Sequence, residues 1–160
     1  MSGVPYYELG GGVSMPGIGL GTWQCGNEEV REAVLEALKV GYRHIDTAWM
    51  YGNERGVGEA VRDWVKGGGD RRELCIVTKL PINANRAQDV ERLLDKQLAE
   101  LGLDYVDLYL IHGPWGWINT GDDKELFSKN DEGYANYDYS TDILAVWAEM
   151  EEMVAKGRRY

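Results

Sequence analysis

The chain has 160 residues, which is enough for one domain with a substantial hydrophobic core. Its formal net charge of −10 argues against general nucleic-acid binding and against docking on anionic membranes, because both need a basic surface. The sequence has no apolar run long enough for a membrane helix and no basic, apolar leader at its start.

The two cysteines, Cys25 and Cys75, are too few for a disulfide framework, and no cysteine or histidine cluster has the spacing of metal ligands. We therefore expect no metal site and a reducing, cytoplasmic environment. Cys75 lies in an apolar run and is expected to be a small buried side chain.

Residues 5–16 form two short segments around a glycine turn, which is typical of a β-hairpin. From residue 17 to residue 160 the chain then alternates four times between strand-like and helix-like segments. The expected strands are PGIGLG at 16–21, RHID at 43–46, ELCIVTKL at 73–80 and DYVDLYLIH at 104–112. The expected helices begin near Asn27, Asn53 and Asn85, and at Ser140 or Thr141.

The strand centres lie near Ile18, Ile45, Ile76 and Leu108, roughly 30 residues apart, which is the spacing of βαβ units. Strands joined by such crossovers run parallel and need helical cover. The pattern predicts an α/β fold of four βα units preceded by a hairpin. A loop at about 113–139, rich in Trp, Tyr, Gly and Asp, is unusually long for a segment without a function.

Titratable side chains stand where the predicted strands end. Asp46 and Tyr51 follow the second strand, Lys79 ends the third, and His112 ends the fourth. Function gathers at the carboxyl ends of parallel strands, so these four side chains are expected to form one site. Each alone has an ordinary explanation, such as a turn cap, a half-buried aromatic, a surface lysine or a structural histidine.

The combination of these residues suits carbonyl reduction. A phenol is a poor acid at neutral pH, and a neighbouring ammonium favours its ionised form. Asp46 would keep Lys79 charged, and His112 could donate a hydrogen bond to a carbonyl oxygen. Side chains supply no hydride, so a reduced cofactor is needed. Two other carboxylates, Glu54 and Asp107, are interpreted as surface groups or as indirect supports of the site.

The sequence resembles the aldo-keto reductases through a dense series of segments in the family's order. These segments are MPGIGLGTW, GYRHIDTAWMYGNE, GVGEAV, RRELCIVTKL and LGLDYVDLYLIHGP. The resemblance implies a (β/α)8 TIM barrel, of which this chain holds the N-terminal half. It also implies reduction of small aldehydes or ketones with NADPH, or with NADH.

By this resemblance Tyr51 is the general acid, Asp46 and Lys79 tune it, and His112 orients the carbonyl. The cofactor contacts implied on this chain are Thr22 and Asp46, and most of the cofactor site is expected outside it. The implied substrate-binding residues are Trp23, Trp49, Met50, His112 and Trp115.

Gly113 stands where many relatives carry a bulky aromatic, and the aromatic residues of the long loop are a candidate replacement. Ordinary surface packing is the alternative for that loop. The segment GVG at 56–58 lies inside a predicted helix and lacks dinucleotide-binding spacing.

Four parallel strands cannot close a barrel, and open strand edges favour association. The sequence therefore leaves two hypotheses. The chain is a truncated or fragmentary reductase, or it is an inactive half-barrel that pairs with itself or with a complementary half.

Overall fold

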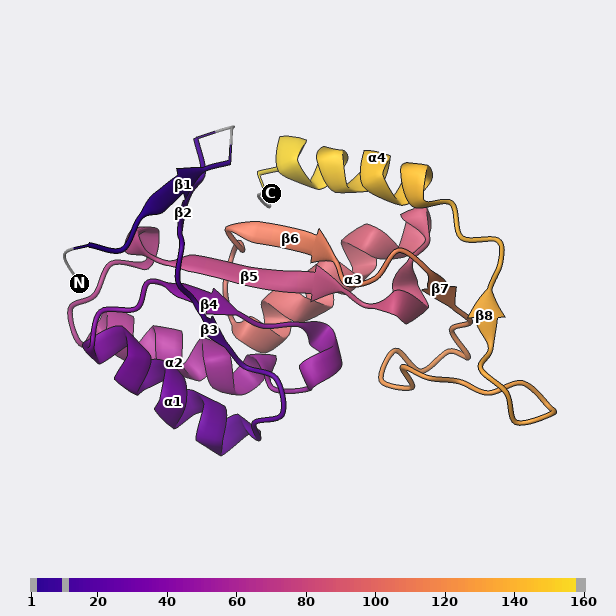
Figure 1. The fold of residues 1–160 in the computed structure, drawn as a ribbon, viewed down its shortest axis with the longest axis horizontal. Coiled ribbons are helices and arrows are strands. Elements are labelled where there is room, and N and C mark those ends of the chain that lie inside the picture. Colours follow the sequence, from indigo (N-terminus) through magenta and orange to yellow (C-terminus); the bar gives the residue numbers. More distant parts are fainter. Residues whose placement is uncertain (1–2, 10–11, 158–160) are drawn as a thin grey trace.

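The computed structural model describes residues 3–9 and 12–157, which form a parallel sheet with helices packed on it (Figure 1). The sheet has the strand order β3-β4-β5-β6. Its strands are β3 (Leu20–Gly21), β4 (His44–Asp46), β5 (Cys75–Leu80) and β6 (Leu108–Ile111). The four strands run parallel, as predicted.

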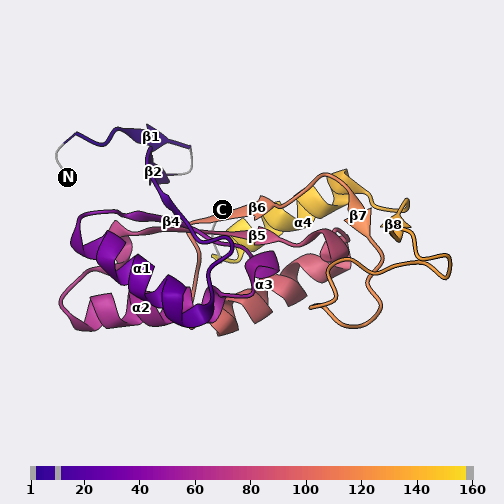
Figure 2. The ribbon, with the colours of Figure 1, turned by 60° about the horizontal axis from the view of Figure 1, so that its bottom comes forward.

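The helices follow the strands in alternation: α1 (Asn27–Lys39), α2 (Glu54–Lys66), α3 (Ala87–Leu101) and α4 (Ile143–Ala155). Figure 2 shows α1, α2 and α3 on one face of the sheet, with the hairpin standing above the other face. Helix α4 lies beside β6 at the edge of the sheet (Figure 1). This arrangement confirms the predicted α/β fold with the topology of half a TIM barrel.

The hydrophobic core fills the space between the sheet and helices α1 to α3. Apolar residues at helical spacing meet the apolar strands there, and they are almost completely buried. The core includes Val30, Val34, Leu38, Ile45, Val57, Val61, Ile76, Leu80, Leu93, Leu94 and Leu101. Cys75 is also buried, which confirms the prediction for this side chain.

The predicted hairpin is present as β1 (Tyr6–Glu8) paired with β2 (Ser14–Pro16) in antiparallel register, although residues 10 and 11 of its turn lie outside the described residues. The prediction of one buried strand over 16–21 was wrong. Pro16 ends β2, only Leu20 and Gly21 pair with β4, and Ile18 is 50% exposed. Gly17 and Gly19 lie between these segments, where a Cβ would come within 2.7 Å of the rings of Tyr7 and His44.

The predicted helix N-caps were partly wrong, because the polar side chains nearby make tertiary contacts instead. Gly26 is the cap of α1, and Asn27 accepts a hydrogen bond from Gly56 N at 2.9 Å. Arg86 precedes α3, and no side chain caps that helix. Asp142, and neither Ser140 nor Thr141, caps α4 by accepting from the backbone of residues 144 and 145.

The long loop carries two short strands, β7 (Gly116–Trp117) and β8 (Tyr137–Asp138), paired in antiparallel register. It extends from the end of the sheet where the strands finish (Figure 1). The Trp117 ring meets Phe127 edge to face and Tyr137 at a tilt, so part of the loop's aromatic content packs within the loop itself. Among the helices of the described residues, none is long and apolar enough to cross a membrane.

Candidate active site

The four predicted catalytic side chains come together at the carboxyl end of the sheet. Asp46 is the last residue of β4, Lys79 lies one residue before the end of β5, and His112 directly follows β6. Tyr51 ends a short 3-10 turn, η1 (Trp49–Tyr51), that follows β4. The parallel register brings the ends of these strands to one edge.

Lys79 is the centre of the group. Its Nζ donates to Asp46 Oδ1 at 2.5 Å, to the Thr47 carbonyl oxygen at 2.9 Å and to the Tyr51 hydroxyl at 3.4 Å. The lysine side chain is 12% exposed and the aspartate side chain 41% exposed. The ammonium is therefore held by a carboxylate and a carbonyl, with the phenol oxygen at the long end of hydrogen-bond distance.

Tyr51 and His112 meet edge to face, with ring centroids 5.6 Å apart and an interplanar angle of 87°. The pKa of His112 is lowered, first because burial disfavours the imidazolium and second because Lys79 repels it, while Asp46 opposes the shift. The buried Nδ1 has no hydrogen-bond partner among the described residues. A neutral imidazole beside the phenol can donate a single N–H to a ligand.

The two residues predicted to contact the cofactor, Asp46 and Thr22, differ in their exposure to solvent. Asp46 is in the site and partly open to solvent. Thr22 is 1% exposed, and its hydroxyl donates to Thr47 Oγ1 at 3.0 Å and, over a longer distance of 3.4 Å, to Asn53 Oδ1. The hydroxyl of Thr22 is thus engaged in a buried polar cluster.

The residues predicted to bind substrate differ in how far they are exposed. Trp23 is 67% exposed and Trp115 is 50% exposed, while Met50 is half-buried in the 3-10 turn. Trp49 is half-buried, and its indole Nε1 donates to the carbonyl oxygen of Asp123 at 3.0 Å. Trp49 is therefore attached to the long loop.

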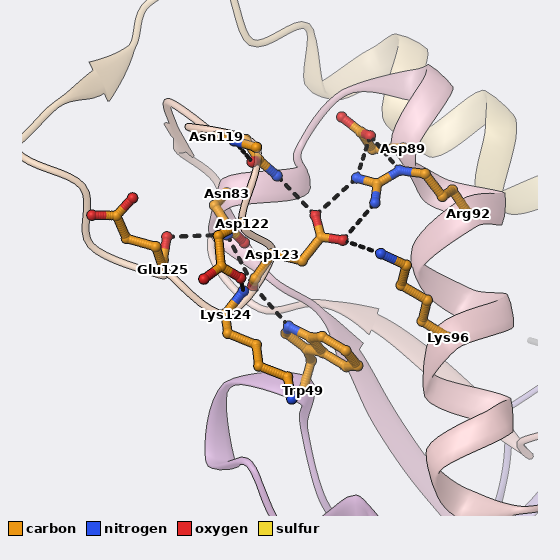
Figure 3. A network of polar contacts seen from close by, with 11 residues as sticks. Trp49, Asn83, Asp89, Arg92, Lys96, Asn119, Asp122, Asp123, Lys124 and Glu125 are labelled. Carbon is orange, nitrogen blue, oxygen red and sulfur yellow. Dashed lines mark hydrogen bonds and ion pairs between the residues drawn. The ribbon is translucent and has the colours of Figure 1, made fainter.

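The long loop is fixed by Asp123, which sequence reasoning did not single out (Figure 3). Its carboxylate accepts from Arg92 at 2.6 and 3.0 Å, from Lys96 at 2.5 Å and from Asn119 at 2.9 Å. Hydrogen bonds from Arg92, and then from Lys96 and Asn119, hold the pKa of Asp123 well below its usual range. The loop is therefore pinned to α3 beside the 3-10 turn that carries Tyr51.

Glu54, in the first turn of α2, was predicted to be either a surface group or an indirect support of the site. The interpretation of this carboxylate as a surface group was wrong, because it is 3% exposed and accepts hydrogen bonds from Thr78 and Gln97. Its position three residues before Val57, on the apolar face of the helix, was the available sequence signal. Asp107 is also largely buried, and it pairs with Arg71 at 2.7 Å at the opposite end of the sheet.

Residues 17–158 match the aldo/keto reductase family, and the chain belongs to that family. It is 44% identical to aldo-keto reductase family 1 member A1 of Xenopus tropicalis, over 96% of this chain and 46% of the relative. It is 43% identical to a D/L-glyceraldehyde reductase of Hypocrea jecorina, over 91% of this chain and 44% of the relative.

Among solved structures, the aldose reductase of Schistosoma japonicum is similar with a TM-score of 0.84 and 37% sequence identity. The match covers 91% of this chain and 48% of that one. The chain thus spans about half the length of the relatives that it matches.

Proposed function

We propose that this chain supplies the catalytic residues of an NAD(P)H-dependent reductase that converts aldehydes or ketones to alcohols. The observation that carries the proposal is the contact of Lys79 Nζ with both Asp46 Oδ1 and the Tyr51 hydroxyl, with His112 against the tyrosine ring. A proton donor, a charge that assists it and an imidazole donor thereby converge on one point.

The residues present fit the reacting end of a nicotinamide cofactor, which supplies the hydride when bound. Asp46 is partly open and lies next to the proton donor, so it is the better of the two expected cofactor contacts. Thr22 is the weaker candidate, because its hydroxyl, its backbone N–H and its carbonyl oxygen already have hydrogen-bond partners. The groups that would hold the cofactor phosphates are expected in a further part of the protein.

Each side chain has a defined task in this reaction. Tyr51 gives its hydroxyl proton to the carbonyl oxygen as negative charge develops there, and solvent later restores the proton. Lys79 favours loss of that proton through its positive charge, and Asp46 with the Thr47 carbonyl keeps the ammonium in place. His112 donates its N–H to the same substrate oxygen and orients it.

The test uses the full chain with glyceraldehyde as the carbonyl, since one relative carries the name of a glyceraldehyde reductase. NADPH and NADH are titrated separately by tryptophan fluorescence, and cofactor oxidation is then followed with substrate present. Tyr51→Phe is expected to lower turnover by about a thousandfold or more and to leave cofactor affinity within about twofold.

The fully exposed Tyr139 gives the matched control, because Tyr139→Phe removes a hydroxyl outside the site and should leave turnover unchanged. Turnover that survives in Tyr51→Phe would contradict the assignment of the proton donor. An absence of quenching by millimolar NADPH and NADH would contradict reductase activity of this chain.

Self-association of a half-barrel is a second candidate function, favoured by the surface at β6. This strand is the last of the described sheet, and a groove of about 660 Å³ runs between it and α4. The groove is lined mainly by apolar side chains, among them Leu110, Trp147 and Met150. An unpaired strand edge beside an apolar groove favours pairing with a second copy.

Sedimentation velocity of the full chain distinguishes a monomer from a dimer. Trp147 lines the groove, and its Nε1 donates to Glu151 Oε1 at 3.1 Å. Trp147→Arg replaces this apolar ring with a charged side chain and should dissociate a dimer. Leu144→Arg on the same helix is the control, because Leu144 is 79% exposed and lies outside the groove. A wild-type chain that sediments as a monomer at about 100 μM excludes this candidate.

A further inference from the structure

A buried polar network lies behind the candidate site, on the helix-covered side of the sheet. Successive residues of a strand point to opposite faces, so Thr78 faces the helices when Lys79 faces the site. Thr78 is fully buried, and its hydroxyl donates to Glu54 Oε1 at 2.6 Å. A carboxylate of α2 thus holds β5 at the residue next to the catalytic lysine.

Gln97 of α3 completes the network. Its Nε2 donates to Glu54 Oε1 at 3.2 Å and to the Lys79 carbonyl oxygen at 3.1 Å. Its Oε1 accepts from the Tyr109 hydroxyl of β6 at 2.8 Å. Two helices and two strands are therefore joined through four buried side chains behind Lys79, those of Glu54, Thr78, Gln97 and Tyr109.

The same glutamate is connected to the predicted proton donor along the chain. Only Gly52 and Asn53 separate Tyr51 from Glu54. Asn53 is itself fixed, because its Nδ2 donates to the carbonyl oxygens of Thr22 and Cys25 at 2.7 and 3.0 Å. The position of the tyrosine thus depends on where the first turn of α2 is attached.

Packing alone does not restrain this turn on all sides. A cavity of about 330 Å³ lies against it, lined by Trp49, Met50, Tyr51, Glu54 and others. Close-packed interiors resist small displacements, whereas a turn beside a cavity can shift at lower cost. The hydrogen bonds that Glu54 accepts from Thr78 of β5 and Gln97 of α3 are one restraint on this turn.

We propose that Glu54 is a positioning residue that sets the separation between the Tyr51 hydroxyl and Lys79 Nζ, acting through Thr78 and Gln97. The inference rests on the proposed function. It adds a residue that touches neither substrate nor cofactor but joins α2, which follows the 3-10 turn of Tyr51, to β5, which carries Lys79.

The ionisation of Glu54 gives this role an observable signature. Burial raises the pKa of Glu54 to about 7, against the opposing hydrogen bonds from Thr78 and Gln97. Of the neighbouring charged groups, Glu100 of α3 raises this pKa and Lys79 of β5 lowers it, and the Tyr109 phenol faces Glu54 from β6. Glu54 therefore changes charge near neutral pH, close to Lys79.

The test is an NMR titration of the full chain labelled at tyrosine Cζ, between about pH 5 and pH 9. Tyr51→Phe assigns the resonance of Tyr51. In the wild type this resonance is expected to move in a step centred near neutral pH. Glu54→Gln keeps the shape of the side chain but cannot ionise, and it should remove the step.

The matched control is Glu59→Gln, which neutralises a partly exposed glutamate of the same helix and should keep the step. The Tyr51 ring also senses His112, whose lowered pKa places its own step at more acidic pH and in all variants. Thr78→Val keeps Glu54 but removes its direct hydrogen bond to β5, and it should displace the Tyr51 resonance at every pH.

Turnover gives a separate readout where the chain reduces glyceraldehyde. Glu54→Gln should then lower kcat by about tenfold and leave KM within about twofold, because a positioned donor is displaced and binding is not. Absence of turnover in the wild type counts against the proposed function alone. The role of Glu54 is overturned if the Tyr51 resonance of the wild type shows no step near neutral pH. It is also overturned if the step persists in Glu54→Gln.

Discussion

The ammonium of Lys79 and the carboxylate of Asp46 lie 2.5 Å apart, although the two residues belong to neighbouring strands and are 33 positions apart in the chain. The lysine is the more buried partner, with 12% of its side chain exposed against 41% for the aspartate. Removal of the aspartate therefore leaves a nearly buried cation with two neutral partners, the Thr47 carbonyl and the Tyr51 hydroxyl, and removal of the charged partner of such a pair is costly.

We expect Asp46→Asn to lower the free energy of unfolding by about 1–2 kcal/mol, a value reduced for the partial exposure of the pair. Urea unfolding of the full chain measures the change. The ion pair of Arg72 with Asp70 lies at the surface, so Arg72→Gln should leave stability nearly unchanged. Equal losses in the two variants would show that the burial of Lys79 does not increase the contribution of its ion pair to stability.

The buried Glu54 predicts that stability falls as pH rises through neutrality. Its pKa in the folded chain, about 7, lies above its ordinary value, so the protonated form stabilises the folded state. This contribution is complete below about pH 4.5 and is lost as pH rises through about 7. A shift of this size corresponds to about 3 kcal/mol.

Urea unfolding at about pH 5 and pH 8 measures this loss for the wild type and for Glu54→Gln. The glutamine variant should lose less stability between the two pH values, since it has no proton to release. Glu59→Gln should behave like the wild type. A wild type whose stability is unchanged over this range would contradict the burial of an ionisable Glu54.

Much of the fold, and the grouping of the four candidate catalytic residues, could be predicted from the sequence. The apolar run that forms β5 and the regular spacing of the strands indicated a parallel sheet. Parallel strands then place their carboxyl ends at one edge, which is why Asp46, Lys79 and His112 could be brought together without coordinates. Tyr51 followed because the turn after β4 is short.

The features that escaped prediction depend on contacts between distant parts of the chain. Asn27 and Asn85 look like helix caps locally, but Asn27 binds Gly56 and Asn85 donates to the carbonyl oxygens of Gly113 and Trp115. Asp123 is one of several acidic residues in a polar loop, and nothing local marks it. Which side chain caps a helix, and which one anchors a loop, therefore depends on contacts with residues that are distant in the sequence.

Gly58 is required by the close approach of α2 to α3. A Cβ at this position would lie 1.8 Å from the backbone oxygen of Leu101, and a backbone atom cannot move aside cheaply. We expect Gly58→Ala to lower the free energy of unfolding by about 3 kcal/mol or more, since the helices must separate. Gly21 faces open space, so Gly21→Ala should cost less than about 0.5 kcal/mol.

Thermal and urea unfolding of both variants test this requirement. An alanine at 58 that is tolerated as well as one at 21 would mean that α2 and α3 do not pack as closely as described. The contrast also explains the glycines of the GVG segment. They are interpreted here as helix-packing positions, because a Cβ at Gly56 would lie 2.2 Å from the Asn27 carbonyl oxygen.

Asp123 should decide whether the long loop is ordered next to Trp49. Its carboxylate is the common acceptor of Arg92, Lys96 and Asn119, and its backbone oxygen accepts from the Trp49 indole (Figure 3). Asp123→Asn removes the charge and leaves two cations of α3 without their shared partner. We expect a loss of about 2 kcal/mol in the free energy that keeps the loop closed.

Hydrogen–deuterium exchange of loop residues 118–126 measures this loss, which corresponds to roughly thirtyfold faster exchange where opening is local. Asp122→Asn is the matched control, because Asp122 is exposed and its carboxylate accepts a hydrogen bond from the backbone N–H of Lys124 within the same loop (Figure 3). The pKa of Asp123 is well below its usual range, so the anchor contributes above the ordinary pKa of a carboxyl group and is lost as pH falls below it. Faster exchange confined to Asp123→Asn supports the anchor, and equal exchange in both variants contradicts it.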